Sequence, residues 1–157
     1  MGEPQNLSVA QRRDGHRLLQ AGGLLFLLGL VVGLGVPRFT LPRLALSTHL
    51  LGITQGTFLM VAGLLWPKLS LTRPVSGIGR VLAIYGCLSA WTANLLGAVW
   101  GAGASMVPIA AGAARGSAFQ EGTIRLLLIS AAVSLLCVAV LILWGLRTLA
   151  HTDSSGQ

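Results

Sequence analysis

Two membrane-length stretches of the sequence carry polar side chains that could do chemistry. His49 and Gln55 lie in the uncharged stretch 44–66, and Asn94 lies in the stretch 81–101. A polar or ionisable group inside a membrane span is costly, so it points to a functional site. The His49 imidazole is the most versatile of the three groups, because it can bind a metal ion or transfer a proton.

Small residues accompany His49 on one side of its predicted helix. Gly52 and Gly56 follow it by three and seven residues, a spacing that places them on the same helical face. This face has no side-chain bulk, so a flat cofactor or a neighbouring helix could lie against it. We therefore take His49, Gly52 and Gly56 as candidate cofactor-binding residues.

The composition indicates an integral membrane protein. Of 157 residues, 54% are apolar and only 10% are charged, which is too little charge to cover a soluble globule. A net charge of +7 would suggest nucleic acid as the partner of a soluble protein. Because the chain is a membrane protein, we expect the lipid bilayer as its surroundings and no nucleic-acid partner.

Four stretches are long and apolar enough to cross a hydrocarbon core of about 30 Å as helices. They predict an all-α fold, a four-helix membrane bundle within residues 16–147, between polar tails at 1–15 and 148–157 that we expect to be disordered. The first stretch is too long for a typical signal peptide, so we expect it to be retained. The predicted spans are 18–36, 44–66, 81–101 and 126–146.

The basic residues are divided unequally between the two sides of the membrane that these spans define. Seven lie on the side of the termini and four on the other, so the positive-inside rule places both termini in the cytoplasm and the chain in the cell's inner membrane. Tryptophans at predicted helix ends are expected to anchor in the membrane interface. The seven are Arg12, Arg13, Arg17, Lys68, Arg73, Arg80 and Arg147; the four are Arg38, Arg43, Arg115 and Arg125; the tryptophans are Trp66, Trp100 and Trp144.

His49 and Asn94 are expected at similar depths in the membrane. His49 lies roughly 8 Å from the outer start of its helix, and Asn94 lies roughly 10 Å from the outer end of the next helix. Gln55 lies about one and a half turns deeper. If their helical faces agree, the three side chains line one buried chamber in the outer half of the membrane.

The remaining polar and sulfur-containing residues give weaker signals. The stretch 101–123 predicts a flexible outer loop, or alternatively a lid or a partly re-entrant segment. Glu121 is among the residues of this stretch that could take part in chemistry. Cys87 and Cys137 lie in different spans, so we expect two small buried hydrophobes rather than a disulfide.

The residues leave two interpretations of His49 open. It can be a structural group whose hydrogen bonds are satisfied, or the ligand of a metal ion or a haem, whose iron often takes a neutral imidazole as axial ligand. His16 and His151 lie at the cytoplasmic edge, so no second histidine ligand is expected from the same chain. One position on a bound iron would then stay open to substrate.

Three segments of the sequence resemble hydroxylaminobenzene mutase and, more distantly, styrene oxide isomerase. The likeness covers roughly residues 17–147. It implies a four-helix membrane isomerase that assembles as a homotrimer, with haem b held near the subunit interfaces. The segments are RLLQAGGLLFLLGLVVGLGVP, LSTHLLGITQGTFLMVAGLLWPKL and WTANLLGAVWG.

The resemblance also implies roles for individual residues. His49 matches the axial histidine, Asn94 matches a substrate-positioning asparagine of styrene oxide isomerase, and Gln55 stands where that enzyme has another asparagine. One residue departs from the pattern, because the catalytic tyrosine of styrene oxide isomerase corresponds to Ala98 here. Tyr85, the sole tyrosine, lies more than two turns toward the cytoplasm. The absence of this tyrosine favours the activity of hydroxylaminobenzene mutase over that of styrene oxide isomerase.

The implied reaction rearranges a small aromatic substrate, an aryl hydroxylamine, to an ortho-aminophenol without net redox change. As a hypothesis, ferric haem on His49 would act as a Lewis acid toward the N-hydroxyl oxygen. Gln55 and Asn94 would be the catalytic side chains that hold the substrate and bridge the migrating oxygen. The surrounding apolar helices would keep water from the cationic intermediate.

Other functions stay open at this point. Epoxide isomerisation is the alternative within the same resemblance, and a haem-bearing membrane anchor for electron transfer would use His49 equally well. A small multidrug exporter normally needs an intramembrane carboxylate, and no Asp or Glu lies in a predicted span. A purely structural membrane subunit would leave His49 and Asn94 merely packed.

Overall fold

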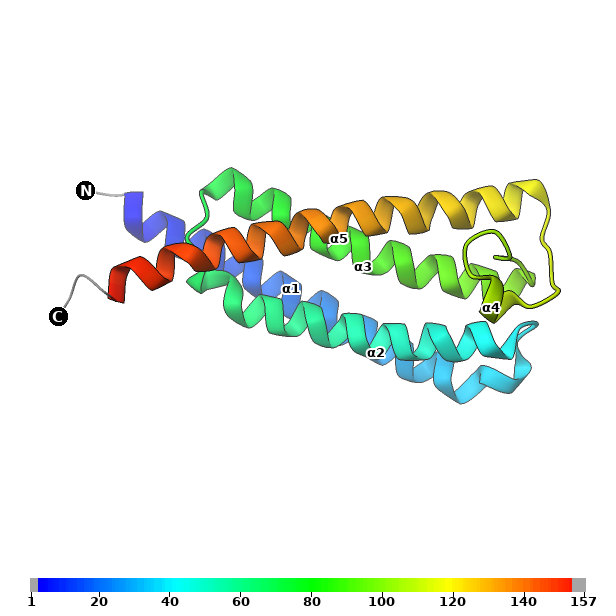
Figure 1. The fold of residues 1–157 in the computed structure, drawn as a ribbon. Coiled ribbons are helices and arrows are strands. Elements are labelled where there is room, and N and C mark those ends of the chain that lie inside the picture. The colour runs from blue at the N-terminus through cyan, green and yellow to red at the C-terminus, as the bar shows by residue number, and fades with distance from the viewer. Residues whose placement is uncertain (1–2, 154–157) are drawn as a thin grey trace.

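The chain folds into helices joined by short connections in the computed structural model, which describes residues 3–153 (Figure 1). The all-α prediction is therefore confirmed. The long helices are α1 (Glu3–Gly35), α2 (Pro42–Leu65), α3 (Arg73–Trp100) and α5 (Ala118–Asp153). The short ones are η1 (Val36–Arg38), η2 (Trp66–Lys68) and α4 (Pro108–Ala111).

Four helical segments in the described part of the chain are long and apolar enough to cross a membrane. Each predicted span lies inside one of these segments to within a single residue. The chain is thus a membrane protein with four candidate spans, as its sequence predicts. The segments are Gln11–Arg38, Pro42–Lys68, Arg73–Trp100 and Ala118–Arg147.

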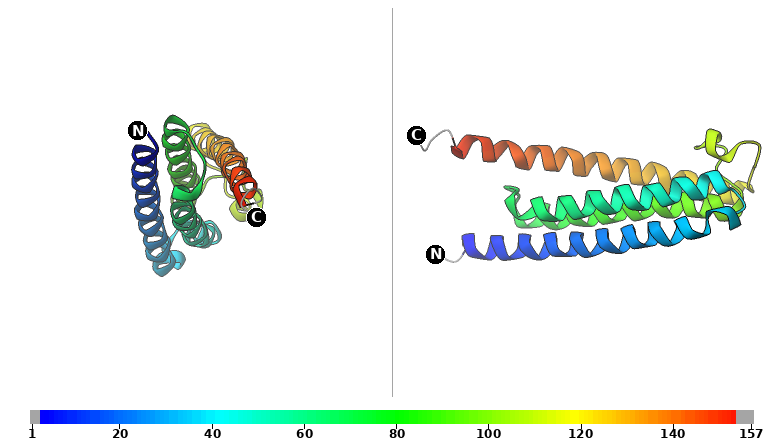
Figure 2. Two further views of the ribbon diagram at one scale, coloured as in Figure 1. Left: turned by 90° about the vertical axis from the view of Figure 1, so that its left-hand side faces the viewer. Right: turned by 90° about the horizontal axis from the view of Figure 1, so that it is seen from below.

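The long helices form an open, curved row rather than a closed bundle (Figure 2). α1 and α2 pair as an antiparallel hairpin, α3 packs against both, and α5 packs mainly along α3. The prediction of a four-helix bundle therefore holds for the number of helices but not for their closure within one chain. Both described ends of the chain lie at the same end of the row, and the connection from α3 to α5 lies at the other (Figure 1).

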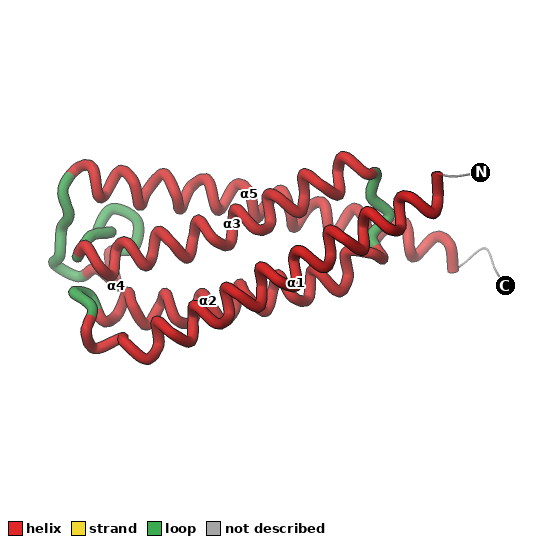
Figure 3. The backbone as a smooth tube through the Cα atoms, turned by 180° about the vertical axis from the view of Figure 1, so that it is seen from behind, coloured by secondary structure: helices red, strands yellow, loops and turns green. Residues whose placement is uncertain are grey.

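Proline and glycine set the boundaries between the helices (Figure 3). Pro42 occupies the first position of α2, where its missing N–H has no helical partner in any case. Gly101 ends α3 with a φ of 69°, a left-handed conformation that favours glycine. These residues fix where α2 begins and where α3 ends.

The N-terminal leader is helical, which the sequence did not predict. α1 begins at Glu3, so the prediction of a disordered tail is wrong for residues 3–15. Gln11 is buried, and its Nε2 donates to the carbonyl oxygens of Leu69 at 3.1 Å and Leu71 at 2.8 Å. Similarly, α5 continues to Asp153, so the C-terminal tail is helical over 148–153. Residues 1–2 and 154–157 lie outside the described residues.

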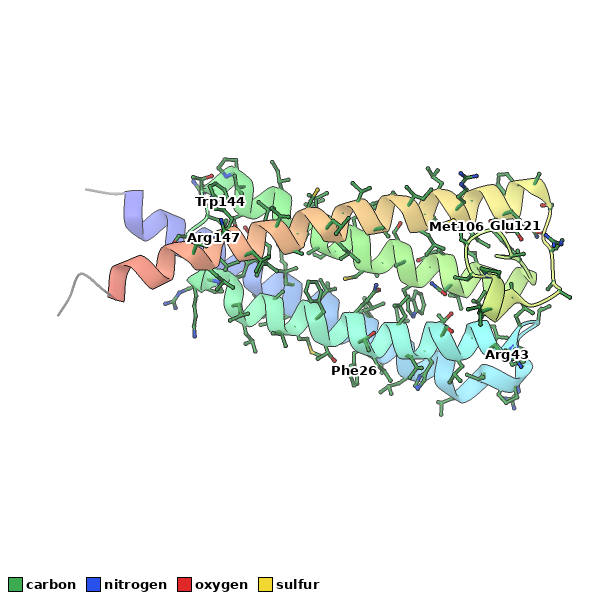
Figure 4. All side chains as sticks on the ribbon, in the orientation of Figure 1. Phe26, Arg43, Met106, Glu121, Trp144 and Arg147 are labelled. Atoms are coloured by element: carbon green, nitrogen blue, oxygen red, sulfur yellow. The ribbon has the colours of Figure 1, made fainter. Side chains whose placement is uncertain are left out.

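A hydrogen-bonded network joins the leader to the connection between α2 and α3. Ser76 Oγ donates to Asp14 Oδ2 at 2.8 Å, and Arg80 Nε forms an ion pair with Asp14 Oδ1 at 3.0 Å. Trp66 Nε1 donates to Ser76 Oγ at 3.0 Å, and the Trp66 side chain is fully buried. The prediction that Trp66 anchors in the membrane interface is therefore wrong, whereas Trp144 near the same end is 58% exposed (Figure 4).

Replacing Asp14 with alanine is expected to destabilise the protein by about 3 kcal/mol, because it leaves a half-buried arginine without its carboxylate. The side chains of Arg80 and Asp14 are only 19% and 13% exposed, so water replaces the lost partner poorly. Thermal unfolding of the detergent-solubilised protein measures the effect. Arg12→Ala is the control, since Arg12 is exposed on the same helix. Equal unfolding temperatures for the two variants would contradict the prediction.

The connection from α3 to α5 is organised by Glu121. Its carboxylate accepts hydrogen bonds from the backbone N–H groups of Gly103 at 2.8 Å and Gly116 at 3.2 Å, and from Ser105 Oγ at 2.9 Å (Figure 4). Val107 and Ala110 of this connection pack on a small core of Leu44, Ala45 and Ala98 at the adjoining ends of α2 and α3. The connection therefore folds over those helix ends.

The two cysteines differ in exposure. Both are free thiols, so no disulfide joins them. Cys87 is buried, as predicted, whereas Cys137 is exposed on α5, so the prediction of a buried side chain is wrong there. Tyr85 is not buried either. Its side chain is 44% exposed, and its hydroxyl donates to Ser130 Oγ at 2.8 Å.

Candidate active site

His49 projects from α2 toward α1 and forms a hydrogen bond with the backbone of α1. The distance from His49 Nδ1 to the Gly29 carbonyl oxygen is 2.8 Å. A carbonyl oxygen only accepts, so Nδ1 carries the hydrogen atom. In the neutral ring this leaves Nε2 with a free lone pair, which is the arrangement of a metal-binding histidine whose other nitrogen is held by a backbone carbonyl.

A glycine one helical turn beyond the acceptor makes room for the imidazole. A Cβ atom at Gly33 would lie 2.5 Å from His49 Nδ1 and 2.7 Å from Cε1 of the same ring. Gly29 and Gly33 are four residues apart on one face of α1. One supplies the carbonyl that orients His49, and the other supplies the space in which the ring lies.

His49 also lines an apolar groove on the outside of the α1–α2 hairpin. The groove has a volume of about 460 Å³, within the range of small-molecule sites. It is shallow and open, since Leu34 at its edge is 82% exposed. The side chains of α1 that line it are Leu27, Leu30, Val31, Gly33 and Leu34.

The bare face at Gly52 and Gly56 is covered by a helix. A Cβ atom at Gly52 would lie 2.6 Å from Gly29 Cα, and one at Gly56 would lie 2.8 Å from the Gly22 carbonyl oxygen. Of the two occupants that the sequence left open, α1 is the one present. Within this chain neither glycine has room for a flat cofactor, so their predicted role in binding one is not supported.

Gln55 and Asn94 do not line the groove beside His49. Six residues separate His49 from Gln55, and at 3.6 residues per turn their side chains point about 120° apart around α2. Asn94 Nδ2 donates to the Ala90 carbonyl of its own helix at 2.9 Å. The predicted common chamber is therefore not formed within one chain, because His49 faces α1 while Gln55 lies on the side of α2 nearer to α3.

The amide pair has a neighbour that the sequence analysis did not select. Trp91 is 8% exposed, and its Nε1 is buried without a hydrogen-bond partner. Gln55 Oε1 is buried and unpartnered as well. A tryptophan three residues before Asn94, in a span already rich in polar residues, was the available signal.

The donor set limits which metal group fits this site. In the described part of the chain, no three His, Cys, Asp or Glu side chains gather into a metal-binding cluster. A bare metal ion at His49 would therefore find no cluster of further ligands among the described residues of this chain. A haem brings four nitrogen ligands of its own and needs one axial imidazole beside an apolar surface, and His49 with its groove offers both.

Comparison with known proteins places the chain in a family. Residues 14–147 match the family model described as styrene oxide isomerase. The chain belongs to this family. Hydroxylaminobenzene mutase HabB of Ectopseudomonas oleovorans is 49% identical over 133 residues, which cover 85% of this chain and 81% of the relative. Hydroxylaminobenzene mutase HabA of the same organism is 41% identical over 129 residues, which cover 82% and 96%.

No solved structure matches the chain. Membership of the styrene oxide isomerase family confirms the resemblance drawn from the sequence segments, and the match spans all four membrane helices. With two mutases among its relatives, the chain is an enzyme of the isomerase and mutase type. Ala98, where the resemblance leads to the expectation of a tyrosine, is fully buried against Leu44 and Ala45 of α2.

Proposed function

We propose that the protein rearranges an aryl hydroxylamine, such as hydroxylaminobenzene, to an ortho-aminophenol inside the membrane. The observation that carries the proposal is His49, whose Nδ1 is held by the Gly29 carbonyl at 2.8 Å and whose Nε2 is left free beside an apolar groove. The names of the two mutase relatives supply the substrate class. In this reaction the N–O bond breaks, a C–O bond forms at the ortho carbon, and that carbon loses a proton while nitrogen gains one.

Ala98 favours the mutase over epoxide isomerisation. The resemblance to styrene oxide isomerase would require a phenol at this position. Ala98 is fully buried, and it packs with Leu44 and Ala45 beneath the outer connection. A tyrosine at position 98 would have to displace α2 to bring its phenol into the site. The alanine found there fits this packing.

The proposed cofactor is haem b, which His49 would hold through its free Nε2. Its iron, when bound, supplies a Lewis acid for the hydroxyl oxygen of the substrate. The protein's contribution is orientation, because the Gly29 carbonyl fixes the tautomer and direction of the imidazole. Leu27, Leu30 and Val31 supply an apolar surface on which a macrocycle can lie.

The proposed catalytic side chains are the two amides. Asn94 donates Nδ2 to its own helix, so its Oδ1 stays available to accept from the substrate. Gln55 Oε1 is buried without a partner, so a bound hydroxyl or amino group would satisfy it. The apolar helices around them exclude water, which would otherwise capture the cationic ring.

Assembly of subunits would bring the two halves of the site together. In one chain, Gln55 and Asn94 do not line the groove at His49. We propose a homotrimer in which the groove of one chain faces the amide side of another. We also propose that the protein lies in the cell's inner membrane with both termini cytoplasmic. The seven basic residues at the end of the row where the termini lie support this orientation.

Turnover of purified protein tests the function. Phenylhydroxylamine is expected to give 2-aminophenol without added reductant, and styrene oxide is expected to be a poor substrate. Asn94→Ala is expected to lower kcat/KM about 10- to 100-fold with haem content unchanged, because it removes a positioning contact rather than a ligand. Liquid chromatography of the products, with absorption spectra of each preparation, measures both.

Two outcomes would contradict the proposal in different ways. Efficient isomerisation of styrene oxide with phenylhydroxylamine left unchanged would assign the chain to the epoxide branch. Conversion of neither substrate by haem-loaded protein would favour a membrane anchor for electron transfer.

A further inference from the structure

A buried indole N–H without a partner is the feature that the proposed function has not used. Trp91 is 8% exposed, and its Nε1 makes no hydrogen bond. Trp66, which is also buried, donates its N–H to Ser76 Oγ at 3.0 Å. Native proteins rarely leave a buried donor unpaired, and an unpaired one calls for a ligand or a functional reason.

The unpaired donor on α3 faces the part of α2 that also carries an unpaired acceptor. A Cβ atom at Gly52 would lie 3.0 Å from Trp91 Nε1, so the indole edge covers this glycine of α2. Gln55 follows Gly52 by three residues, a spacing at which Cβ positions are about 5–6 Å apart on a helix. Its Oε1 is buried and has no partner. One small polar group between α2 and α3 can therefore reach both.

The chemistry of the two unpaired groups is complementary to a hydroxylamine. The indole N–H only donates, and the Gln55 oxygen only accepts. An N–OH group has oxygen lone pairs that accept and both N–H and O–H bonds that donate. Asn94 follows Trp91 by three residues on α3, so its free Oδ1 lies on the neighbouring turn.

We propose that Trp91 is a substrate-positioning residue, whose indole N–H donates to the hydroxyl oxygen of the substrate while Gln55 Oε1 accepts from the same N–OH group. The proposal rests on the proposed function and adds a donor to a site that otherwise holds amides. Two opposite contacts on one N–OH group fix its rotation about the C–N bond. The hydroxyl oxygen is thereby held beside one ortho carbon.

Ultraviolet resonance Raman spectroscopy tests the contact directly, because the indole bands report hydrogen bonding of the N–H group. The difference between wild type and Trp91→Phe isolates the signal of Trp91 from those of the other three tryptophans. With 2-aminophenol as the probe, this signal is expected to shift from a free to a hydrogen-bonded N–H. The Trp66 signal, isolated in the same way with Trp66→Phe, is expected to stay constant.

Kinetics supply the second measurement. Trp91→Phe keeps an aromatic ring and removes the donor, so kcat/KM for phenylhydroxylamine is expected to fall about three- to tenfold, the effect of one neutral hydrogen bond. Haem content is expected to stay at the wild-type level. Trp100→Phe is the matched control on the same helix, because Trp100 packs in an apolar cluster away from Gln55. Its kcat/KM is expected to equal that of wild type.

The outcomes separate the inference from the function on which it rests. Turnover of phenylhydroxylamine with no Raman shift at Trp91 would overturn the inference and leave the mutase intact. A Trp91 signal that is already hydrogen-bonded before 2-aminophenol is added, and unchanged after it, would overturn it in favour of an internal water. If the wild type does not convert phenylhydroxylamine, the proposed function fails first and the inference fails with it.

Discussion

Replacing His49 with alanine is expected to remove the haem Soret band and to lower kcat/KM for phenylhydroxylamine by about 10³-fold or more. Among the side chains that line the groove, His49 is the one that can bind a metal. The fold is expected to survive, because the ring is only half-buried and makes a single hydrogen bond to α1. Absorption spectra and turnover of the same preparation measure both losses.

His16→Ala is the matched control for this experiment. His16 lies on α1 and is exposed, outside the groove, so its replacement is expected to leave spectrum and turnover unchanged. Added imidazole is expected to restore part of the Soret band in His49→Gly, where the ligand can enter the space of the lost ring. Full haem retention by His49→Ala would show that another group binds the iron.

Replacing Gly33 with alanine is expected to weaken haem binding about 10- to 100-fold while leaving His49 in the chain. The new Cβ atom would lie 2.5 Å from His49 Nδ1, so the ring must turn away and lose the Gly29 carbonyl. Loss of an orienting partner of a metal ligand typically has an effect of this size. Titration of haem into haem-free protein measures the dissociation constant.

Gly23→Ala provides the comparison on the same helix. A Cβ atom at Gly23 would meet no atom within 4 Å, so this variant makes the same chemical change in open space. Both substitutions raise the helix propensity of α1 by about 1 kcal/mol, which cancels when the two variants are compared. Equal haem affinity for both would refute the assigned role of Gly33.

The four membrane spans could be predicted because length and hydropathy decide them within the sequence itself. The leader could not be predicted in the same way. Residues 3–15 are polar and lack an apolar face, but Gln11 and Asp14 find partners on the connection between α2 and α3. Contacts between residues some sixty positions apart leave no periodic signal in the leader.

The candidate site shows the same limit at the level of side-chain direction. His49 and Asn94 could be placed at similar depths, because depth follows from counting residues along each helix. Which neighbour each faces depends on the rotation of the helices about their axes. Contact with α1 fixes His49 toward Gly29, while Gln55 points to another side of α2. Residues that lie at similar depths in the membrane therefore face different neighbours.

A signal for that rotation was present in the sequence. Gly15, Gly22 and Gly29 recur every seven residues, and each lies against a glycine of α2. Such small residues allow two membrane helices to approach closely along one line. Gly33 lies outside this heptad series and serves His49 instead. Gly29 and Gly33 therefore have two different roles, although both lie on one face of α1.

The α1–α2 hairpin carries a consequence for the order of events during synthesis. His49, the Gly29 carbonyl and the groove all belong to the first two helices. At about 5–20 residues per second, the ribosome needs roughly 5–20 s to add the roughly 90 residues that follow α2. A nascent hairpin leaving the insertion machinery already displays its oriented imidazole during that interval. Capture of the proposed haem and membrane insertion can therefore overlap in time, before α3 and its Asn94 exist.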